Sequence, residues 1–540
     1  MYVIVALGAL MIVAFAGNAS DYRKAAEQGS AEAQFSTNIT KKLAEAIKKC
    51  RMAAEQGNAA AQNKLGACYK FGFGVTKDLS EAVRWYRKAA EQGDAEAQYN
   101  LAVCYFSGDG VSEDLTEAVK WYLKAANQGH VSAQSTLGFC YENGRGVKKD
   151  LTEAVKWYHK VAEQGGAPEQ LKLGFCYENG TGVSKDFIKA AKWYRKAAEQ
   201  GYPPAQRELG ICYVKGTGVA SDLAEAVKWY RKAAEQGDVE AQYMLGVSYA
   251  KGAGVTKNLI EAVKWYRKAA EQGDGGAQYK LGTCYEFGAG VTPDLAEAVK
   301  WYRKASEHGS AEAQCSLGIC YAKGIGVTKD FVEAVKWYCK AAGQGNAPAQ
   351  YNLGLCYEYG SGVTKDLVEA VKWYRKAAEQ GYGEAQYILA LFYSNGYGVT
   401  KDLAEAVKWY LTAANQGHAK AQFLLGICYF QGAGVTKDLA EAVKWYRKAA
   451  ELGDSEAQFM LAFSYAQGSG VSKDFVEAVK WCRKAAEQGK SLAQFNLGLC
   501  YERGYGVTKD PIEAVKWYRK AARQGEQQAK VKLNDLGESW

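Results

Sequence analysis

Histidine and cysteine are the residues of this chain whose side chains could carry acid–base, nucleophilic or metal chemistry. The 540 residues include four histidines, His130, His159, His308 and His418. No C-x-x-C or H-x-x-x-H spacing occurs, so the sequence predicts neither a zinc site nor a histidine general base. Most enzyme classes lose support for this reason.

The cysteines follow a fixed spacing. Ten of the 14 occupy one position that recurs at multiples of 36 residues: Cys68, Cys104, Cys140, Cys176, Cys212, Cys284, Cys320, Cys356, Cys428 and Cys500. Equivalent positions in stacked units should lie about 8 to 10 Å apart, beyond the roughly 7 Å Cα separation that a disulfide tolerates. We therefore interpret these ten as small buried thiols.

Two further cysteines, Cys50 and Cys482, each precede one of these ten by 18 residues. In an antiparallel helical hairpin, Cys50 would lie level with Cys68, and Cys482 with Cys500. Each pair is open to two interpretations, a disulfide or a chance substitution.

Glycine pairs such as Gly144 and Gly146 do not form a phosphate-binding loop, because they follow a helical pattern and lack the P-loop lysine. Helix capping accounts for the Asp-x-x-Glu spacings, which leaves no carboxylate pair for hydrolysis. We expect no cofactor, no metal and no catalytic residue.

The tryptophans reveal the elements that position these residues. Thirteen of the 14 lie 36 residues apart without interruption: Trp85, Trp121, Trp157, Trp193, Trp229, Trp265, Trp301, Trp337, Trp373, Trp409, Trp445, Trp481 and Trp517. A fixed short period indicates a repeat protein, whose units bury their faces by stacking on their neighbours.

Each unit has the pattern of two helices. In residues 95–107, Ala97, Leu101 and Tyr105 follow one another at i, i+4 and i+8, which is one face of a helix. After a glycine turn, Asp114 and Glu117 have the spacing of a capping box, and a glycine ends the second helix. We call the two helices of a unit helix A and helix B. The sequence thus predicts an all-α solenoid of helical hairpins with a 36-residue repeat.

The predicted boundaries follow from the repeat. Thirteen full units cover residues 58–525, a degenerate copy that we expect to act as a cap covers residues 20–57, and a C-terminal capping helix and tail cover residues 526–540. Residues 1–19 include an apolar run that predicts a cleaved signal peptide. Export to a periplasm, the medium or a secretory lumen would follow. The alternative is an uncleaved membrane anchor at residues 1–17.

The repeats resemble the Sel-one-like repeat (SLR) family, relatives of the tetratricopeptide repeats (TPR). The resemblance covers residues 21–536 and is carried by units such as AEAQYNLAVCYFSGDGVSEDLTEAVKWYLKAANQG and SEAQFMLAFSYAQGSGVSKDFVEAVKWCRKAAEQG. It implies a TPR-like, right-handed superhelix whose concave wall consists mainly of helix A, acting as an adaptor for other proteins. A link of some SLR proteins to cell-wall or β-lactam chemistry implies an alternative, a cell-envelope enzyme or enzyme accessory.

One face of helix A varies between units, most of all at the position of Asn100. This position becomes Ile388, Leu424 and Met460 in three successive later units. Together with their neighbours these residues form what we call the apolar strip: Tyr387, Ile388, Leu391, Phe423, Leu424, Ile427, Phe459, Met460 and Phe463. Contiguous exposed apolar surface marks an interaction site, so the strip predicts a binding groove. The alternative is that these side chains pack against the neighbouring helix.

The charge and the strip together define the predicted function. A net charge of +9 over thirteen units is below one charge per unit, which predicts a solvated outer face and no nucleic-acid partner. The sequence predicts a non-enzymatic scaffold that binds a protein or extended peptide on the concave face. We expect no small-molecule substrate, and membrane contact only through an uncleaved N-terminal segment.

Overall fold

The structure is a computed structural model that describes residues 44–539, and every regular element in this range is an α-helix. The predicted all-α fold of helical hairpins is confirmed. None of the described helices has the length and apolar character needed to cross a bilayer. The predicted signal peptide or anchor and the first part of the predicted N-terminal cap lie outside the described residues.

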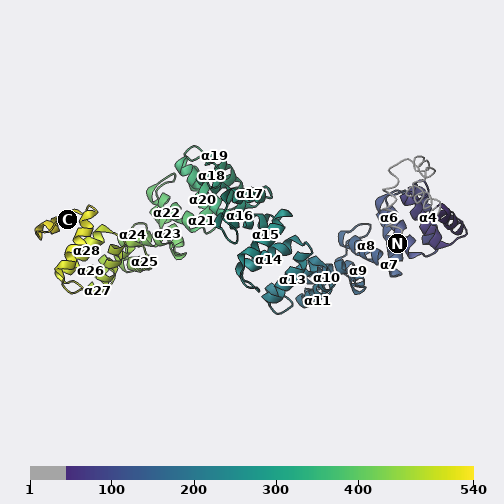
Figure 1. The fold of residues 1–540 in the computed structure, drawn as a ribbon, viewed down its shortest axis with the longest axis horizontal. Helices are drawn as coiled ribbons and strands as arrows, with labels where there is room; N and C mark the ends of the chain where they lie inside the picture. The colour runs from purple at the N-terminus through teal and green to yellow at the C-terminus, as the bar shows by residue number, and fades with distance from the viewer. Residues whose placement is uncertain (1–43, 540) are drawn as a thin grey trace, which may run out of the picture. The chain divides into compact units, whose positions relative to one another are not determined.

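The chain divides into two compact bodies, Met1–Asn258 and Leu259–Trp540, and the described part of each is a row of helices that follow the hairpin pattern (Figure 1). In the first, residues 44–55 are helical and are followed by α4 (Ala59–Phe71), α5 (Leu79–Glu91), α6 (Ala95–Ser107), α7 (Leu115–Asn127), α8 (Val131–Asn143), α9 (Leu151–Glu163), α10 (Ala167–Asn179), α11 (Phe187–Glu199), α12 (Pro203–Lys215), α13 (Leu223–Glu235) and α14 (Val239–Lys251).

The second body continues the same pattern. It contains α15 (Leu259–Glu271), α16 (Gly275–Phe287), α17 (Leu295–Glu307), α18 (Ala311–Lys323), α19 (Phe331–Gly343), α20 (Ala347–Tyr359), α21 (Leu367–Glu379), α22 (Gly383–Asn395), α23 (Leu403–Asn415), α24 (Ala419–Gln431), α25 (Leu439–Glu451), α26 (Ser455–Gln467), α27 (Phe475–Glu487), α28 (Ser491–Arg503), α29 (Pro511–Arg523) and α30 (Gln527–Asp535). Even-numbered helices from α4 to α28 are helix A of their hairpins, and odd-numbered helices from α5 to α29 are helix B.

The start of helix B is capped, although only half of the predicted capping box forms. The Asp114 side chain accepts from the Glu117 backbone N–H at 2.9 Å, as expected. The Asp114 N–H donates instead to the Tyr105 carbonyl, and the Glu117 carboxylate pairs with Lys120 at 2.8 Å. The reciprocal bond is absent because the tight turn after helix A already uses the donor that Glu117 would need.

Two glycines of the repeat allow close packing. In helix A, a Cβ on Gly138 would lie 2.3 Å from the Tyr158 ring of the facing helix B. In the turn, Gly146 has φ +72°, and a Cβ there would lie 2.1 Å from the carbonyl oxygen of Leu115, which begins the preceding helix B. The first glycine brings the helices of a hairpin together, and the second seats the turn on the unit before it.

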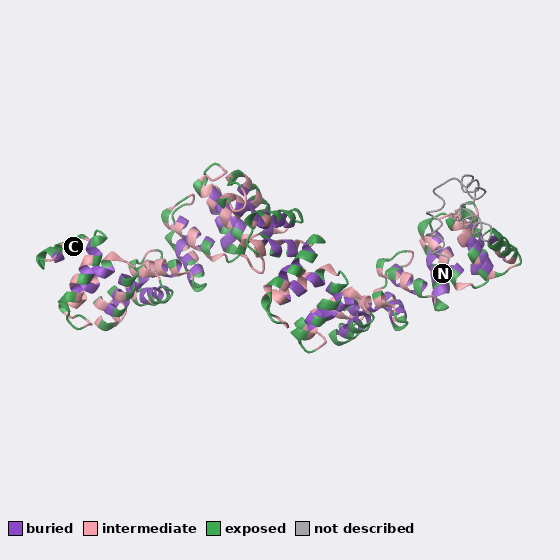
Figure 2. Cartoon of the chain, in the orientation of Figure 1, coloured by how far each residue is buried: buried purple, intermediate pink, exposed green. Residues whose placement is uncertain are grey.

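The core repeats in every hairpin, as Figure 2 shows for the buried residues. Helix A contributes side chains such as Ala97 and Leu101, and helix B contributes Ala118, Tyr122 and Ala125, all at most 2% exposed. Small alanines let the helices approach, and the tyrosine fills the space between them. Within each of the two bodies, successive helices pack on one another, so the variable residues of helix A follow one another along the row.

Candidate interaction surface

The structure places the apolar strip on three successive A helices, α22, α24 and α26. Eight of its nine side chains are half-buried, and Phe463 is 42% exposed. Ile388 and Leu424 pack against one core cluster, and Phe423 and Met460 pack against the next. Eight of the nine strip side chains therefore pack partly against the core and are partly exposed, whereas Phe463 is exposed.

A second position, near the end of helix A, also distinguishes the strip units from the others. In five units this position holds a glutamate that accepts a hydrogen bond from the helix B tyrosine at 2.5–2.9 Å. The pairs are Glu142 with Tyr158, Glu178 with Tyr194, Glu286 with Tyr302, Glu358 with Tyr374, and Glu502 with Tyr518. In the three strip units, Ser394, Phe430 and Ala466 stand there instead. Sequence reasoning missed this glutamate, although its constant distance of 16 residues from the tyrosine was a usable signal.

The central strip unit contains a buried hydroxyl that lacks a partner. Tyr446 is fully buried, and its hydroxyl has no hydrogen-bond partner among the described residues. Phe430 replaces the acceptor, and the ring of Phe423 lies 6.1 Å from the Tyr446 ring. An unpaired buried hydroxyl costs about 1 to 3 kcal/mol. The apolar character of this unit is thus maintained at a cost in stability.

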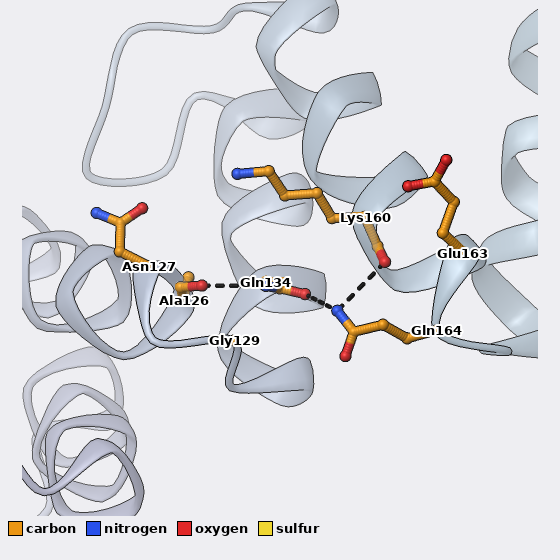
Figure 3. Close-up of a pocket in the computed structure, with 7 residues that line it drawn as sticks. All are labelled: Ala126, Asn127, Gly129, Gln134, Lys160, Glu163 and Gln164. Carbon is orange, nitrogen blue, oxygen red and sulfur yellow. Dashed lines mark hydrogen bonds between the residues drawn. The ribbon is translucent and has the colours of Figure 1, made fainter.

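A recurring pair of glutamines, one buried on helix A and one exposed after helix B, links each hairpin internally and to the repeat before it. Figure 3 shows it in a shallow depression of about 380 Å³ near the turn before α8. Gln134 donates to the Ala126 carbonyl at 3.0 Å, and its own carbonyl accepts from Gln164 at 2.8 Å. Gln164 also donates to the Lys160 carbonyl at 3.3 Å. These polar groups satisfy one another, so we assign the depression a structural role.

The glutamine pair is interrupted twice. The second glutamine follows the first by 30 residues, and His308 and Leu452 stand in its place after Gln278 and Gln422. The side-chain oxygens of Gln278 and Gln422 are buried and have no partner in the described part of the chain. The second break lies within the strip units, on α24.

Two of the four histidines, His130 and His418, cap the start of a helix. The Nδ1 atom of His418 accepts from the Ala421 N–H at 3.1 Å, and the ring stacks on Tyr387 at 4.6 Å. His130 makes the same bond to Ala133, also at 3.1 Å. Tyr387 and His418 help line a depression of about 590 Å³ beside the strip. Within residues 44–539, no group of three or more His, Cys, Asp or Glu side chains is arranged to hold a metal.

The cysteines are free thiols in the structure. Cys50 and Cys482 each donate a hydrogen bond to a backbone carbonyl, of Ala61 at 3.3 Å and of Ala493 at 3.2 Å. Burial raises the pKa of the Cys482 thiol to about 12. Such thiols are poor nucleophiles at neutral pH because the thiolate is the reactive form.

The lysines on the outer face of helix B contact residues of their own helix. Lys120 pairs with Glu117, and the Lys124 ammonium lies 3.7 Å from the centroid of the Trp121 ring. The same two contacts recur along the chain, for example at Lys156 with Glu153. This arrangement fits the predicted solvated outer face.

Comparison with known proteins identifies the family. A model of the Sel1 repeat matches fourteen segments of the chain: residues 22–30, 59–94, 95–130, 131–166, 170–202, 203–238, 239–274, 276–310, 311–346, 347–382, 383–418, 419–454, 455–490 and 491–526. The chain belongs to the Sel1 repeat family. The resemblance to SLR proteins is therefore confirmed, and the exact bounds of the terminal caps remain predictions.

Two solved structures of repeat proteins are similar to the chain. The chain is similar to c5321, a protective antigen of uropathogenic Escherichia coli with an SLR fold, at 41% identity and a TM-score of 0.64, over 77% of this chain and 90% of that one. It is also similar to a Sel1 repeat protein of Oxalobacter formigenes, at 37% identity and a TM-score of 0.49, over 57% of this chain and 90% of that one. A search of curated proteins returned no match.

Proposed function

We propose that this Sel1 repeat protein is a non-catalytic scaffold that binds an apolar segment of a partner protein on the apolar strip. The observation that supports this most strongly is the replacement of polar residues by Ile388, Leu424 and Met460 in three successive units. Repeats of this kind are suited to protein binding because they present a long surface made of equivalent positions. The proposal includes export through residues 1–19.

The fold itself does not require apolar residues at this position. Lys64 and Lys280 occupy it in other units and are exposed. Binding of a partner therefore explains the apolar side chains of the three strip units better than packing within the fold does. Their partial exposure leaves surface that a partner would bury.

A lysine substitution tests the proposal. Leu424→Lys places a charge in the centre of the strip. We expect the variant to lose a partner protein that the parent chain captures. Asn352→Lys is the matched control, because it adds the same side chain at the equivalent position two units earlier. The measurement is affinity capture with identification of bound proteins by mass spectrometry, after both variants are shown to have the thermal midpoint of the parent.

Equal capture by the parent and by Leu424→Lys would contradict a binding role for the strip. A lower thermal midpoint for Leu424→Lys alone would show that the side chain serves the core. The cell-envelope enzyme alternative has no described constellation of residues in its favour and remains a prediction from the family resemblance.

A further inference from the structure

The glutamate near the end of helix A lies next to the variable position of the following unit. In two places a lysine fills that position and neutralises the carboxylate. The Lys172 ammonium lies 2.5 Å from Glu142, and the Lys532 ammonium lies 3.0 Å from Glu502. A cation at this position is therefore within reach of the carboxylate wherever both occur.

Glu358, at the end of α20, lacks this cation. Its carboxylate accepts from the Tyr374 hydroxyl at 2.5 Å, and no Lys, Arg or His of the described chain pairs with it. The residue at the lysine position of the next unit is Ile388, which belongs to the apolar strip. A half-buried negative charge thus borders the strip on the α20 side.

The opposite border is different. Beyond α26 the next unit has Asn496 at the variable position, and its glutamate, Glu502, is already paired with Lys532. Within the three strip units, the nine strip positions and the glutamate position contain no charged side chain, although Glu384, Lys420 and Glu456 lie one turn earlier on the same helices. The C-terminal halves of α20, α22, α24 and α26 therefore offer the Glu358 carboxylate, which no cation pairs, followed by three apolar steps.

The spacing of these steps fits an extended chain. Side chains of successive A helices touch one another, as Lys172 and Glu142 do, and helices in contact lie about 8 to 10 Å apart. Three residues of a polyproline II segment advance about 9 Å and return to the same face. Every third side chain of such a segment would meet successive A helices. A ligand with one cation and three apolar side chains at this interval matches the surface in both charge and length.

We propose that the apolar strip binds an extended peptide segment in which a lysine or arginine pairs with Glu358 and three apolar side chains, one at every third residue, contact α22, α24 and α26. This inference rests on the proposed function and adds the charge and spacing of the partner. The partner's cation takes the place that Lys172 and Lys532 occupy beside their own glutamates.

The test uses capped ten-residue peptides and the full chain. Each peptide has three leucines at every third position and serine or proline elsewhere, with a lysine three residues before the first leucine or three residues after the last. Neutral analogues carry glutamine in place of lysine. Fluorescence anisotropy should show that one lysine peptide binds about tenfold more tightly than its glutamine analogue, and that this preference shrinks in high salt.

Two variants separate the contributions of charge and strip. Glu358→Gln keeps an acceptor for Tyr374, and we expect it to remove the tenfold preference for lysine. Glu286→Gln is the control, because Glu286 makes the same bond to Tyr302 but is followed by Ser316 instead of a strip residue. This control should retain the preference.

The outcomes distinguish the two proposals. Persistence of the lysine preference in Glu358→Gln would overturn the inference. Equal binding of lysine and glutamine peptides that Leu424→Lys abolishes would also overturn it, while supporting the strip as a binding surface. If no peptide bound at about 1 mM, both the inference and the proposed peptide-binding function would be wrong.

Discussion

Single side chains distinguish the strip units from the rest of the array. Tyr302 and Tyr446 occupy the same helix B position and are both fully buried. The Tyr302 hydroxyl donates to Glu286, whereas the Tyr446 hydroxyl has no partner in the described structure because Phe430 replaces the glutamate. The two tyrosines therefore allow the energetic value of one hydrogen bond to be measured in equivalent surroundings.

Replacing these tyrosines by phenylalanine should have opposite consequences. Tyr446→Phe removes an unpaired hydroxyl, so we expect the free energy of local opening to stay the same or rise by up to about 1 kcal/mol. Tyr302→Phe leaves Glu286 without its donor and should lower that free energy by about 1 kcal/mol. Native-state hydrogen exchange of the amides in each hairpin measures both. An equal loss in the two variants would mean that Tyr446 has a partner.

The recurring glutamine pair connects the helices in series. In the intact pair, one glutamine joins helix B of a unit to helix A of the next, and the second joins that helix A to its own helix B. Leu452 breaks the connection at α24, where the oxygen of Gln422 is buried and unpaired. The two helices of the hairpin that carries the centre of the strip are thus less firmly tied to each other, while Gln422 still donates to the Ala414 carbonyl of the preceding unit.

Restoring the glutamine should stabilise this element. We expect Leu452→Gln to supply the missing donor to Gln422 and to raise the free energy of local opening of α24 and α25 by about 1 kcal/mol. Leu452→Ala, which also removes the exposed leucine but adds no donor, is the control. Hydrogen exchange should slow about fivefold in the glutamine variant alone, and the same slowing in both would rule out the hydrogen bond as its cause.

At the scale of the whole molecule, the repeated buried thiols predict that stability depends on pH. Burial raises the pKa of Cys140 to about 11 and that of Cys320 to about 12. A folded thiol therefore keeps its proton at a pH where the unfolded chain has lost it. The resulting stabilisation is complete below the unfolded pKa of about 8.5 and is lost as the pH rises toward the folded value.

The expected result is an alkaline loss of stability that adds up over the units. The thermal midpoint should be constant up to about pH 8 and fall steadily from about pH 9 to 11. A variant with the ten helix A cysteines replaced by serine should fall less, because serine does not ionise and already occupies this position as Ser248 and Ser464. Circular dichroism melts of both proteins provide the measurement, and parallel curves would exclude the thiols as the cause.

The sequence by itself determined the period, the hairpin and the position of most buried side chains. Ala97, Leu101 and Tyr122 recur at helical spacing, and a short repeat leaves few ways to bury them. Local rules also sufficed for Asp114 as a helix cap, because its acceptor lies within three residues. Comparison of equivalent positions found the apolar strip for the same reason, since the repeat aligns the residues that lie on one face.

Only the tertiary structure decided which polar side chains meet. The bond from Gln164 to Gln134 joins residues 30 apart, and the Glu358 carboxylate reaches Tyr374 across the hairpin. Such contacts depend on the rotation of each helix and its distance from the next, which periodicity does not specify. The same is true of Tyr446, whose lack of a partner becomes visible only when the side chains around its hydroxyl are placed in space.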